Sequence, residues 1–332
     1  MSNYLLCCDW GTSFFRLRLV NSADYRLIEE VTSQQGIASI FNAWKANGER
    51  AGVAREQFFR EELIKQIELV AHKAAIKLDQ VPIAVSGMAS SSIGMDEVPY
   101  ATLPFAMDGS RASFRHFDAS ESFPHELILI SGVKSEEDVM RGEETQLIGL
   151  SALLDSAGNR PDEAIYIFPG THSKHMYVQA GQLLNFETHM TGEVFNLMAS
   201  TSILRDSVDV SAFSDFSTEN LSAFKLGLKE ANFPLLNRLF TVRTNQLFGN
   251  LTRQQNAFFL SGLLIGAELK PLLEKAQWHL VLCSGSNLFP FYQQAIEDLD
   301  LSNRTTIIPA GLIDKAAIAG QIILFQNQNL KV

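Results

Sequence analysis

Hydrophobic and polar positions at the start of the chain predict three consecutive strands. Residues 4–8 form a short apolar run that ends in a glycine-containing turn. Across residues 15–20, apolar side chains alternate with mostly basic ones, a period of two that is typical of a half-buried strand. Residues 25–32 are expected to form a third strand. The N-terminal segment is therefore predicted to be a three-stranded meander.

Helices and strands then alternate through the rest of the first half. Between residues 55 and 78, apolar side chains such as Phe59 and Leu63 recur at three- and four-residue steps, as on one face of a helix. Residues 81–86 and 127–131 are apolar enough to be strands buried on both faces. A three-stranded meander followed by alternating helices and strands is the element order of a ribonuclease H-like domain.

The second half repeats this order, which implies an internal duplication. We therefore expect an α/β protein made of two ribonuclease H-like domains. The expected elements are strands at 164–168, 175–179, 183–187, 278–283 and 305–308, a helix at 253–273, and a terminal helix from residue 312.

The boundary between the two domains is predicted from turn-forming residues. Gly, Asn, Pro and Asp cluster at 155–162, between stronger elements. We therefore expect domains at 1–155 and 156–332, with the terminal helix at 312–332 packing back on the first domain.

Composition and charge limit which binding partners and which cellular compartment we expect for this protein. The chain has 332 residues, 46% of them hydrophobic and 19% charged, as in globular proteins. A formal net charge of -10 argues against nucleic acid as a main partner. Cys7, Cys8 and Cys283 are too few and poorly spaced for a disulfide framework. With a strand beginning at residue 4 and an apolar stretch at 258–269 that is too short to span a bilayer, we expect a cytoplasmic protein without a signal peptide or membrane contact.

The first loop, Asp9-Trp10-Gly11-Thr12-Ser13, follows the first predicted strand. Its carboxylate can hold Mg²⁺, and its amides and hydroxyls can hold phosphate oxygens. A glycine there lets a phosphate approach the backbone closely. The alternative is an ordinary turn, because Asp and Gly are favoured in turns.

The second loop, Gly170-Thr171-His172-Ser173-Lys174, also follows an apolar strand and precedes a hairpin. It supplies a second set of amides and hydroxyls. Two such loops facing each other would clamp a polyphosphate between the domains. A polar hairpin loop without function is the alternative.

Glu143 and Glu144 lie at the start of a predicted helix at the end of the first domain. Acidic residues in a first turn compensate the helix dipole. The functional alternative is that one carboxylate takes the proton from a substrate hydroxyl during phosphoryl transfer.

Two further motifs allow a functional and a structural interpretation. Gly285 and Asn287 follow a buried strand and could line a nucleotide, or simply form a strand-to-helix turn. His172, His175 and His189 lie close in sequence or across the hairpin, but their spacing matches no usual zinc arrangement, so we expect no zinc site.

The motifs carry a resemblance to a known family. The first loop resembles the first phosphate motif of the sugar kinase, hexokinase, heat-shock protein and actin superfamily. Blocks at 140–149, 169–174, 190–193 and 261–268 resemble, in the same order, those of the 2-dehydro-3-deoxygalactonokinase family. The resemblance covers essentially the whole chain.

The resemblance implies an actin-like ATPase fold whose interdomain cleft closes around ATP, Mg²⁺ and a small sugar acid. It implies transfer of the ATP γ-phosphate to the 6-hydroxyl of 2-dehydro-3-deoxy-D-galactonate in galactonate catabolism. The first domain would be the substrate side and the second the nucleotide side. Carried over by position, the phosphate loops would be Asp9, Gly11, Thr12 and Ser13, then Gly170, Thr171 and Lys174, with Gly285 and Asn287 on the adenosine side.

Related kinases use an aspartate as the base at the end of the first domain. Here that region offers only Glu143 and Glu144, so we favour Glu143, then Glu144, with Asp9 as the fallback and as the metal ligand. The second loop also departs from the superfamily's Gly-Thr-Gly form, because His172 replaces the second glycine.

A sugar-acid carboxylate requires a cationic partner. Arg16 and Arg141 are the candidates, although either could be a structural ion-pair partner. The strand ends expected on the same rim add Gln35, Gly36, Gly87 and Met88 as candidate substrate-binding residues.

Alternative functions share the fold. The chain could phosphorylate another small sugar or sugar acid, or act as an ATP-driven switch like actin or a chaperone. A sugar-responsive repressor would need an N-terminal helix-turn-helix, for which the first strand leaves no room. A homodimer is left open.

Overall fold

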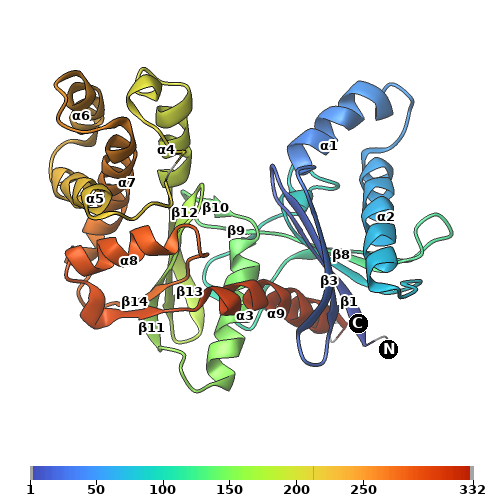
Figure 1. Ribbon diagram of the computed structural model, residues 1–332. Coiled ribbons are helices and arrows are strands. Elements are labelled where there is room, and N and C mark those ends of the chain that lie inside the picture. The colour runs from blue at the N-terminus through green and yellow to red at the C-terminus, as the bar shows by residue number, and fades with distance from the viewer. Residues whose placement is uncertain (1–2, 212, 330–332) are drawn as a thin grey trace. The chain divides into compact units, whose positions relative to one another are not determined.

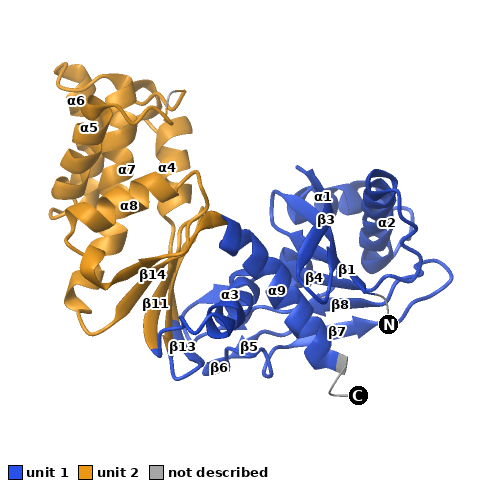
Figure 2. Ribbon diagram, turned by 60° about the horizontal axis from the view of Figure 1, so that its bottom comes forward, with its two compact units in different colours: residues 1–162, 179–185, 311–332 blue, residues 163–178, 186–310 orange. Residues whose placement is uncertain are grey.

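The computed structural model describes residues 3–211 and 213–329. Two compact units divide the chain (Figure 2). Unit 1 contains the chain up to Asp162, residues 179–185, and the segment from Gly311 onward. Unit 2 contains residues 163–178 and 186–310. The domain limits 1–155 and 156–332 stay a prediction, and residues 330–332 of the expected terminal helix lie outside the described residues.

The main sheet of unit 1 has the strand order β3-β2-β1-β4-β8-β7 (Figure 1). β1, β2 and β3 form the antiparallel meander, and β4 and β8 run parallel to β1. The strands are β1 (Tyr4–Trp10), β2 (Phe15–Asn21), β3 (Arg26–Ser33), β4 (Ile83–Gly87), β7 (Phe114–Phe117) and β8 (Leu127–Ile130). Short strands complete unit 1: β5 (Ala101–Thr102), β9 (Val133–Lys134) and β10 (Val139–Met140) form a second sheet, and β6 (Phe105–Ala106) pairs with residues 182 and 183.

Helices α1 (Ile37–Ala43) and α2 (Arg55–Ala74) contribute buried side chains to the hydrophobic core of unit 1. Phe59, Leu63, Ile67 and Val70 of the predicted stripe are buried in the core of unit 1, which confirms the helical pattern. The helix ends earlier than residue 78 because Ala75 adopts a left-handed conformation, with φ 54°, that caps it.

Helices α3 (Glu143–Ser156) and α9 (Ala310–Asn329) pack together with almost no space between their backbones. A Cβ on Gly149 would lie 1.9 Å from the Ala316 carbonyl oxygen, and one on Gly320 would lie 1.9 Å from the Thr145 carbonyl oxygen. Only glycine allows this contact. Gln321 of α9 also donates to the Cys8 carbonyl, at 2.6 Å, which ties the helix to β1.

In the sheet of unit 2 the strand order is β15-β14-β11-β12-β13. In unit 1 the corresponding order is β8-β4-β1-β2-β3, so β11 has the same place in its sheet as β1 has in the other. β14 and β15 run parallel to β11, as β4 and β8 do to β1. Both units are therefore ribonuclease H-like, and the fold predicted from the sequence is confirmed. The elements are β11 (Glu163–Phe168), β12 (Ser173–Gln179), β13 (Gln182–His189), α4 (Thr191–Ser200), α5 (Thr218–Glu230), α6 (Leu235–Leu247), α7 (Arg253–Leu269), β14 (His279–Leu282), α8 (Phe289–Asp298) and β15 (Thr305–Ile307).

Helix α7 is the centre of unit 2. With its 3₁₀ extension it runs over Arg253–Glu274, 22 residues, and an 18-residue window of it has a mean hydropathy of 1.2, so by length and composition it could cross a membrane. The apolar stretch expected at 258–269 is the middle part of this helix. However, 78% of the residues in its apolar window are buried. Packing against α5 explains the apolar composition, since Gly227 and Gly262 let the two helices touch.

Candidate functional site

The first loop lies in unit 1, where a neighbouring segment fixes its backbone. The Gly11 amide donates to the Phe14 carbonyl at 2.9 Å and closes the turn. The Ile37 amide donates to the Gly11 carbonyl at 2.9 Å. Gly36 touches the loop so closely that a Cβ there would lie 2.4 Å from the Thr12 carbonyl oxygen. The structure thus brings the loop together with the predicted segment at Gly36.

Gln35 joins the same cluster, since its carbonyl accepts a hydrogen bond from the Trp10 indole at 3.1 Å. Thr12 and Ser13 are exposed, and their hydroxyls can reach a ligand. These contacts are nearly all between backbone atoms, so the loop's shape depends on the path of the chain.

Asp9 stands at the end of β1, opposite the end of β4. Gly87 adopts φ 88°, and a Cβ there would lie 3.4 Å from Asp9 Oδ1 and 2.8 Å from the Trp10 carbonyl oxygen. Burial raises the pKa of Asp9, although the charges of Arg18 and Arg16 partly oppose this. A cation beside the carboxylate would lower that pKa again. The carboxylate and the neighbouring hydroxyls are hard oxygen donors, and the glycine leaves room beside them, so the residues fit Mg²⁺.

The start of α3 lies beside Gly87. Gly142 has φ 109°, and a Cβ there would lie 3.6 Å from the Gly87 Cα. Met88, the next residue of that segment, is partly exposed. Unit 1 therefore gathers Asp9, Gly87 and the two predicted glutamates on one rim.

The two glutamates differ in surroundings. Glu144 is 2% exposed, and its two carboxyl oxygens accept from the Gly142 amide at 2.7 Å and from the Thr145 hydroxyl at 2.9 Å. Burial, together with the charge of Glu143, raises the pKa of Glu144 to about 8. Glu143 is partly exposed.

The side chain of Arg141 makes several contacts within unit 1. Its guanidinium donates to the Ser90 hydroxyl at 2.6 Å and to the Val98 carbonyl at 3.4 Å, and it lies 3.9 Å from the centre of the Tyr100 ring. These contacts hold the segment that precedes α3.

Arg16 is held more loosely. It lies 3.6 Å from the Glu30 carboxylate and 3.8 Å from the Asp314 carboxylate, and its side chain is 31% exposed. Of the two predicted partners for a substrate carboxylate, Arg16 is thus the one that can more readily turn toward a ligand.

The second loop lies in unit 2 and is fixed by side chains. The Gly170 amide donates to the Ser173 hydroxyl at 3.3 Å, and that hydroxyl bonds the Tyr292 hydroxyl at 3.1 Å. Gly192, near the start of α4, packs on the loop, since a Cβ there would lie 2.5 Å from the Gly170 carbonyl oxygen. Lys174 is buried, with its ammonium 3.4 Å from the His172 carbonyl oxygen.

A pocket of about 640 Å³ opens beside the second loop. This volume is in the range of small-ligand sites. Its walls are mostly apolar, with a few polar groups near the loop. It is lined by Gly170, Thr171, Thr191, Gly192, Phe195, Asn196, Ala199, Ser200, Val210, Phe213, Ser261, Leu264, Ile265, Leu288 and Tyr292.

Only some of the residues predicted to bind the nucleotide line this pocket. Gly170 and Thr171 line it, whereas Gly285 and Asn287 lie just before the lining residue Leu288. The side chains of the pocket wall were missed from the sequence, apart from the blocks at 190–193 and 261–268. Helical periodicity alone does not distinguish a pocket wall from a core.

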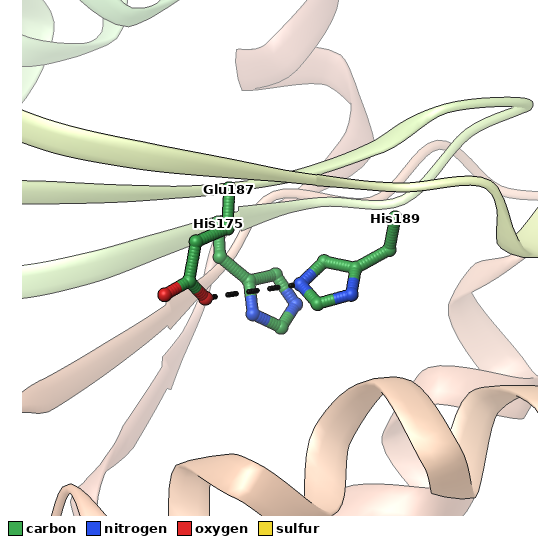
Figure 3. A group of neighbouring side chains, drawn as sticks. All are labelled: His175, Glu187 and His189. Carbon is green, nitrogen blue, oxygen red and sulfur yellow. Dashed lines mark ion pairs between the residues drawn. The ribbon is translucent and has the colours of Figure 1, made fainter. Parts of the chain in front are cut away.

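Two of the three predicted histidines, His175 and His189, lie on β12 and β13, the strands of the hairpin that follows the second loop. His175, Glu187 and His189 place potential ligand atoms within 4.8 Å of one another (Figure 3). The Glu187 carboxylate, however, already accepts from the Lys275 ammonium at 3.1 Å and from Tyr177 at 2.9 Å. An ammonium there opposes a metal cation, so we interpret the group as an ion-pair cluster.

Comparisons with known proteins agree with the sequence motifs. The family described as 2-keto-3-deoxy-galactonokinase matches residues 9–321. The 2-dehydro-3-deoxygalactonokinase of Escherichia coli K12 is 34% identical over 229 residues, covering 66% of this chain and 71% of that protein. "Probable 2-dehydro-3-deoxygalactonokinase DgoK1" of Rhizobium meliloti 1021 is 29% identical over 315 residues, covering 91% and 92%.

A solved structure is similar over nearly the whole chain. It is a crystal structure from Sinorhizobium meliloti of a protein assigned as a 2-dehydro-3-deoxygalactonokinase. The TM-score is 0.73 and the identity 26%, covering 98% of this chain and 96% of that one.

Proposed function

Because this chain belongs to the 2-keto-3-deoxy-galactonokinase family, we propose that it phosphorylates the 6-hydroxyl of 2-dehydro-3-deoxy-D-galactonate with ATP. The observation that carries the proposal is the family match, which extends from Asp9 in the first loop to Gln321 in the terminal helix. The enzyme is thus a kinase of a small sugar acid in galactonate catabolism.

The nucleotide is proposed to bind unit 2. The apolar pocket wall suits an adenine ring, and Gly170 and Thr171 stand at its polar end, where the phosphates would lie. Gly285 and Asn287 would contact the adenosine from the turn before α8, and Lys174 would add charge behind the loop.

The first loop is proposed to hold the transferred phosphate and Mg²⁺. Asp9 would hold the ion, directly or through water, while Gly11, Thr12 and Ser13 orient the phosphate oxygens. When bound, Mg²⁺ neutralises charge on the phosphates. The close contact of Gly36 with the loop keeps these groups in place.

Glu143 is proposed as the general base. Glu144 is buried and both of its oxygens accept hydrogen bonds within the protein, so it is poorly placed to accept a substrate proton. Glu143 stands one residue earlier, at the partly exposed start of α3. It would take the proton of the 6-hydroxyl as the oxygen attacks the γ-phosphorus and ADP leaves.

Arg16 is proposed to bind the substrate carboxylate, with Gln35, Gly36, Gly87 and Met88 shaping the pocket. Arg16 is supported by its loose ion pairs. Because the Arg141 guanidinium already contacts Ser90 and Tyr100, it would hold the segment before α3 in place and would not bind the substrate carboxylate itself.

We also propose a cytoplasmic enzyme that binds neither nucleic acid nor membrane. The net charge of -10 supports the first exclusion, and three buried, free cysteines fit a reducing compartment. A homodimer remains a prediction.

The test is coupled ADP release with 2-dehydro-3-deoxygalactonate and with its gluconate epimer. We expect turnover with the galactonate compound and at least tenfold lower kcat/KM with the epimer. Faster turnover of another sugar acid would correct the substrate. ATP hydrolysis that responds to no sugar acid would contradict the kinase function and favour an ATP-driven switch.

A further inference from the structure

Unit 2 contains a buried carboxylate that the proposed chemistry does not use. Glu268, in α7, is 3% exposed. It accepts hydrogen bonds from the Tyr292 hydroxyl at 2.7 Å and from the Thr191 hydroxyl, and it bonds His175 Nε2 at 3.2 Å. A buried charge is costly unless it is paired and hydrogen-bonded, so this arrangement requires an account.

The three partners come from the elements that surround the second loop. Tyr292 is on α8, Thr191 is the first residue of α4, and His175 is on β12, directly after the loop. Next to Thr191, Gly192 packs against the Gly170 carbonyl. One carboxylate of α7 thus joins three elements next to the loop: β12, α4 and α8.

The hydrogen bonds are donated in one direction, from the loop to Glu268. Because the Tyr292 hydroxyl donates its proton to Glu268, it must accept from the Ser173 hydroxyl, 3.1 Å away. The Ser173 oxygen is then free to accept from the Gly170 amide at 3.3 Å. Without the carboxylate, the Tyr292 and Ser173 protons could reverse, and Ser173 would then donate its proton to the Gly170 carbonyl, 3.5 Å away, and no longer to Tyr292.

The electrostatics agree with this direction. Burial alone would raise the pKa of Glu268, but hydrogen bonds from His175, Thr191 and Tyr292 outweigh it and hold that pKa below its ordinary value. Burial also raises the pKa of Tyr292 well above its usual range, so its hydroxyl keeps the proton that it donates.

We propose that Glu268 is a positioning residue that orients the second loop toward the nucleotide phosphates through Tyr292 and Ser173. The role rests on the proposed function, since it assumes that the loop binds phosphate. Glu268 acts through its neighbours and contacts no phosphate itself. It should therefore affect the affinity for phosphate groups more than the affinity for the base.

The experiment compares two ligands in three proteins. Glu268→Gln keeps the side-chain size but replaces an acceptor oxygen by a donor. Asn256→Ala is the matched control, because Asn256 is a fully buried polar residue of the same helix that bonds the Ser207 and Val242 carbonyls, away from the loop. ADP affinity is measured by calorimetry and adenosine affinity by ligand-observed NMR titration.

We expect Glu268→Gln to weaken ADP binding at least tenfold and to change adenosine binding less than about twofold. A tenfold loss corresponds to about 1.4 kcal/mol. The control should leave the ratio of the two affinities as in the wild type. If Glu268→Gln does not fold, Ser173→Ala breaks the same chain of hydrogen bonds and should shift the ratio in the same direction, whereas Ser173→Thr, which keeps the hydroxyl, should restore it.

An unchanged ratio in folded Glu268→Gln, or an equal shift in Asn256→Ala, would overturn the positioning role while the kinase function stands. Wild-type protein that binds neither ADP nor adenosine would instead refute nucleotide binding, and the role with it.

Discussion

Two buried glutamates, one in each unit, have pKa values that are shifted in opposite directions. Glu144 in unit 1 accepts two hydrogen bonds and has another carboxylate as its neighbour, and its pKa rises to about 8. Glu268 in unit 2 bonds a histidine and two hydroxyls, and its pKa falls. Burial is similar, so the partners decide the charge. The unit 1 rim is shaped by backbone contacts and glycines, whereas the second loop depends on an ionised side chain.

The largest effect on stability is expected at Glu268. Glu268→Gln should lower the free energy of unfolding by about 3 kcal/mol at neutral pH, because charged hydrogen bonds are lost in a buried site. Since the folded-state pKa lies below the ordinary value, this contribution is present above about pH 4.5 and is lost as the pH falls. Urea unfolding at several pH values measures it. An equal difference between the two proteins at all pH values would mean that Glu268 is not ionised.

The next effect is on catalysis in unit 1. Glu143→Gln should lower kcat at least about a hundredfold, the low end for removal of a general base, with ADP affinity unchanged. Glu121→Gln, at an exposed position of unit 1, is the control. If Glu143→Gln keeps its rate and Glu144→Gln loses it, the buried glutamate is the base and our assignment is wrong.

A methyl group at Gly36 tests whether backbone contacts shape the first loop. Gly36→Ala places a Cβ 2.4 Å from the Thr12 carbonyl oxygen, so we expect a loss of about 2 kcal/mol in stability and reduced turnover. Gly311→Ala, where a Cβ meets nothing within 4 Å, should change neither. Thermal unfolding and steady-state rates measure both variants. Normal turnover in Gly36→Ala would show that the loop adapts.

A separate effect is the pH dependence of stability that Glu144 causes. Between about pH 4.5 and pH 8 the unfolded chain releases this proton and the folded protein keeps it, so stability falls as the pH rises. Glu144→Gln should remove a slope of at most about 1.4 kcal/mol per pH unit. Parallel stability curves for the two proteins would show that Glu144 titrates normally.

The fold was predictable from the sequence because its strands carry their signal locally. Each unit begins with a meander whose apolar runs end in a glycine-containing loop, and that order alone defines the topology. The ends of the helices were harder to predict. Helix α2 ends at Ala74 because Ala75 adopts a left-handed conformation, which the pattern of apolar residues does not indicate.

The site was predictable only in part. Asp9, Gly36 and Gly87 could be placed on one rim because strand ends meet there. The sequence could not show which of Glu143 and Glu144 is the better candidate for the general base. Helix α3 buries residues on most of its sides, so no polar face indicates which side chain is accessible. The role of Glu268 could not be found, since His175 lies 93 residues away in the sequence.

The return of the terminal helix to unit 1 affects how the molecule is made on the ribosome. α9 closes against α3 through Gly149 and Gly320, so unit 1 lacks that helix until residues beyond 310 have emerged. Most of unit 2 is translated earlier and can collapse around α7 first. Vectorial synthesis would therefore complete the inserted unit 2 before unit 1, which begins the polypeptide.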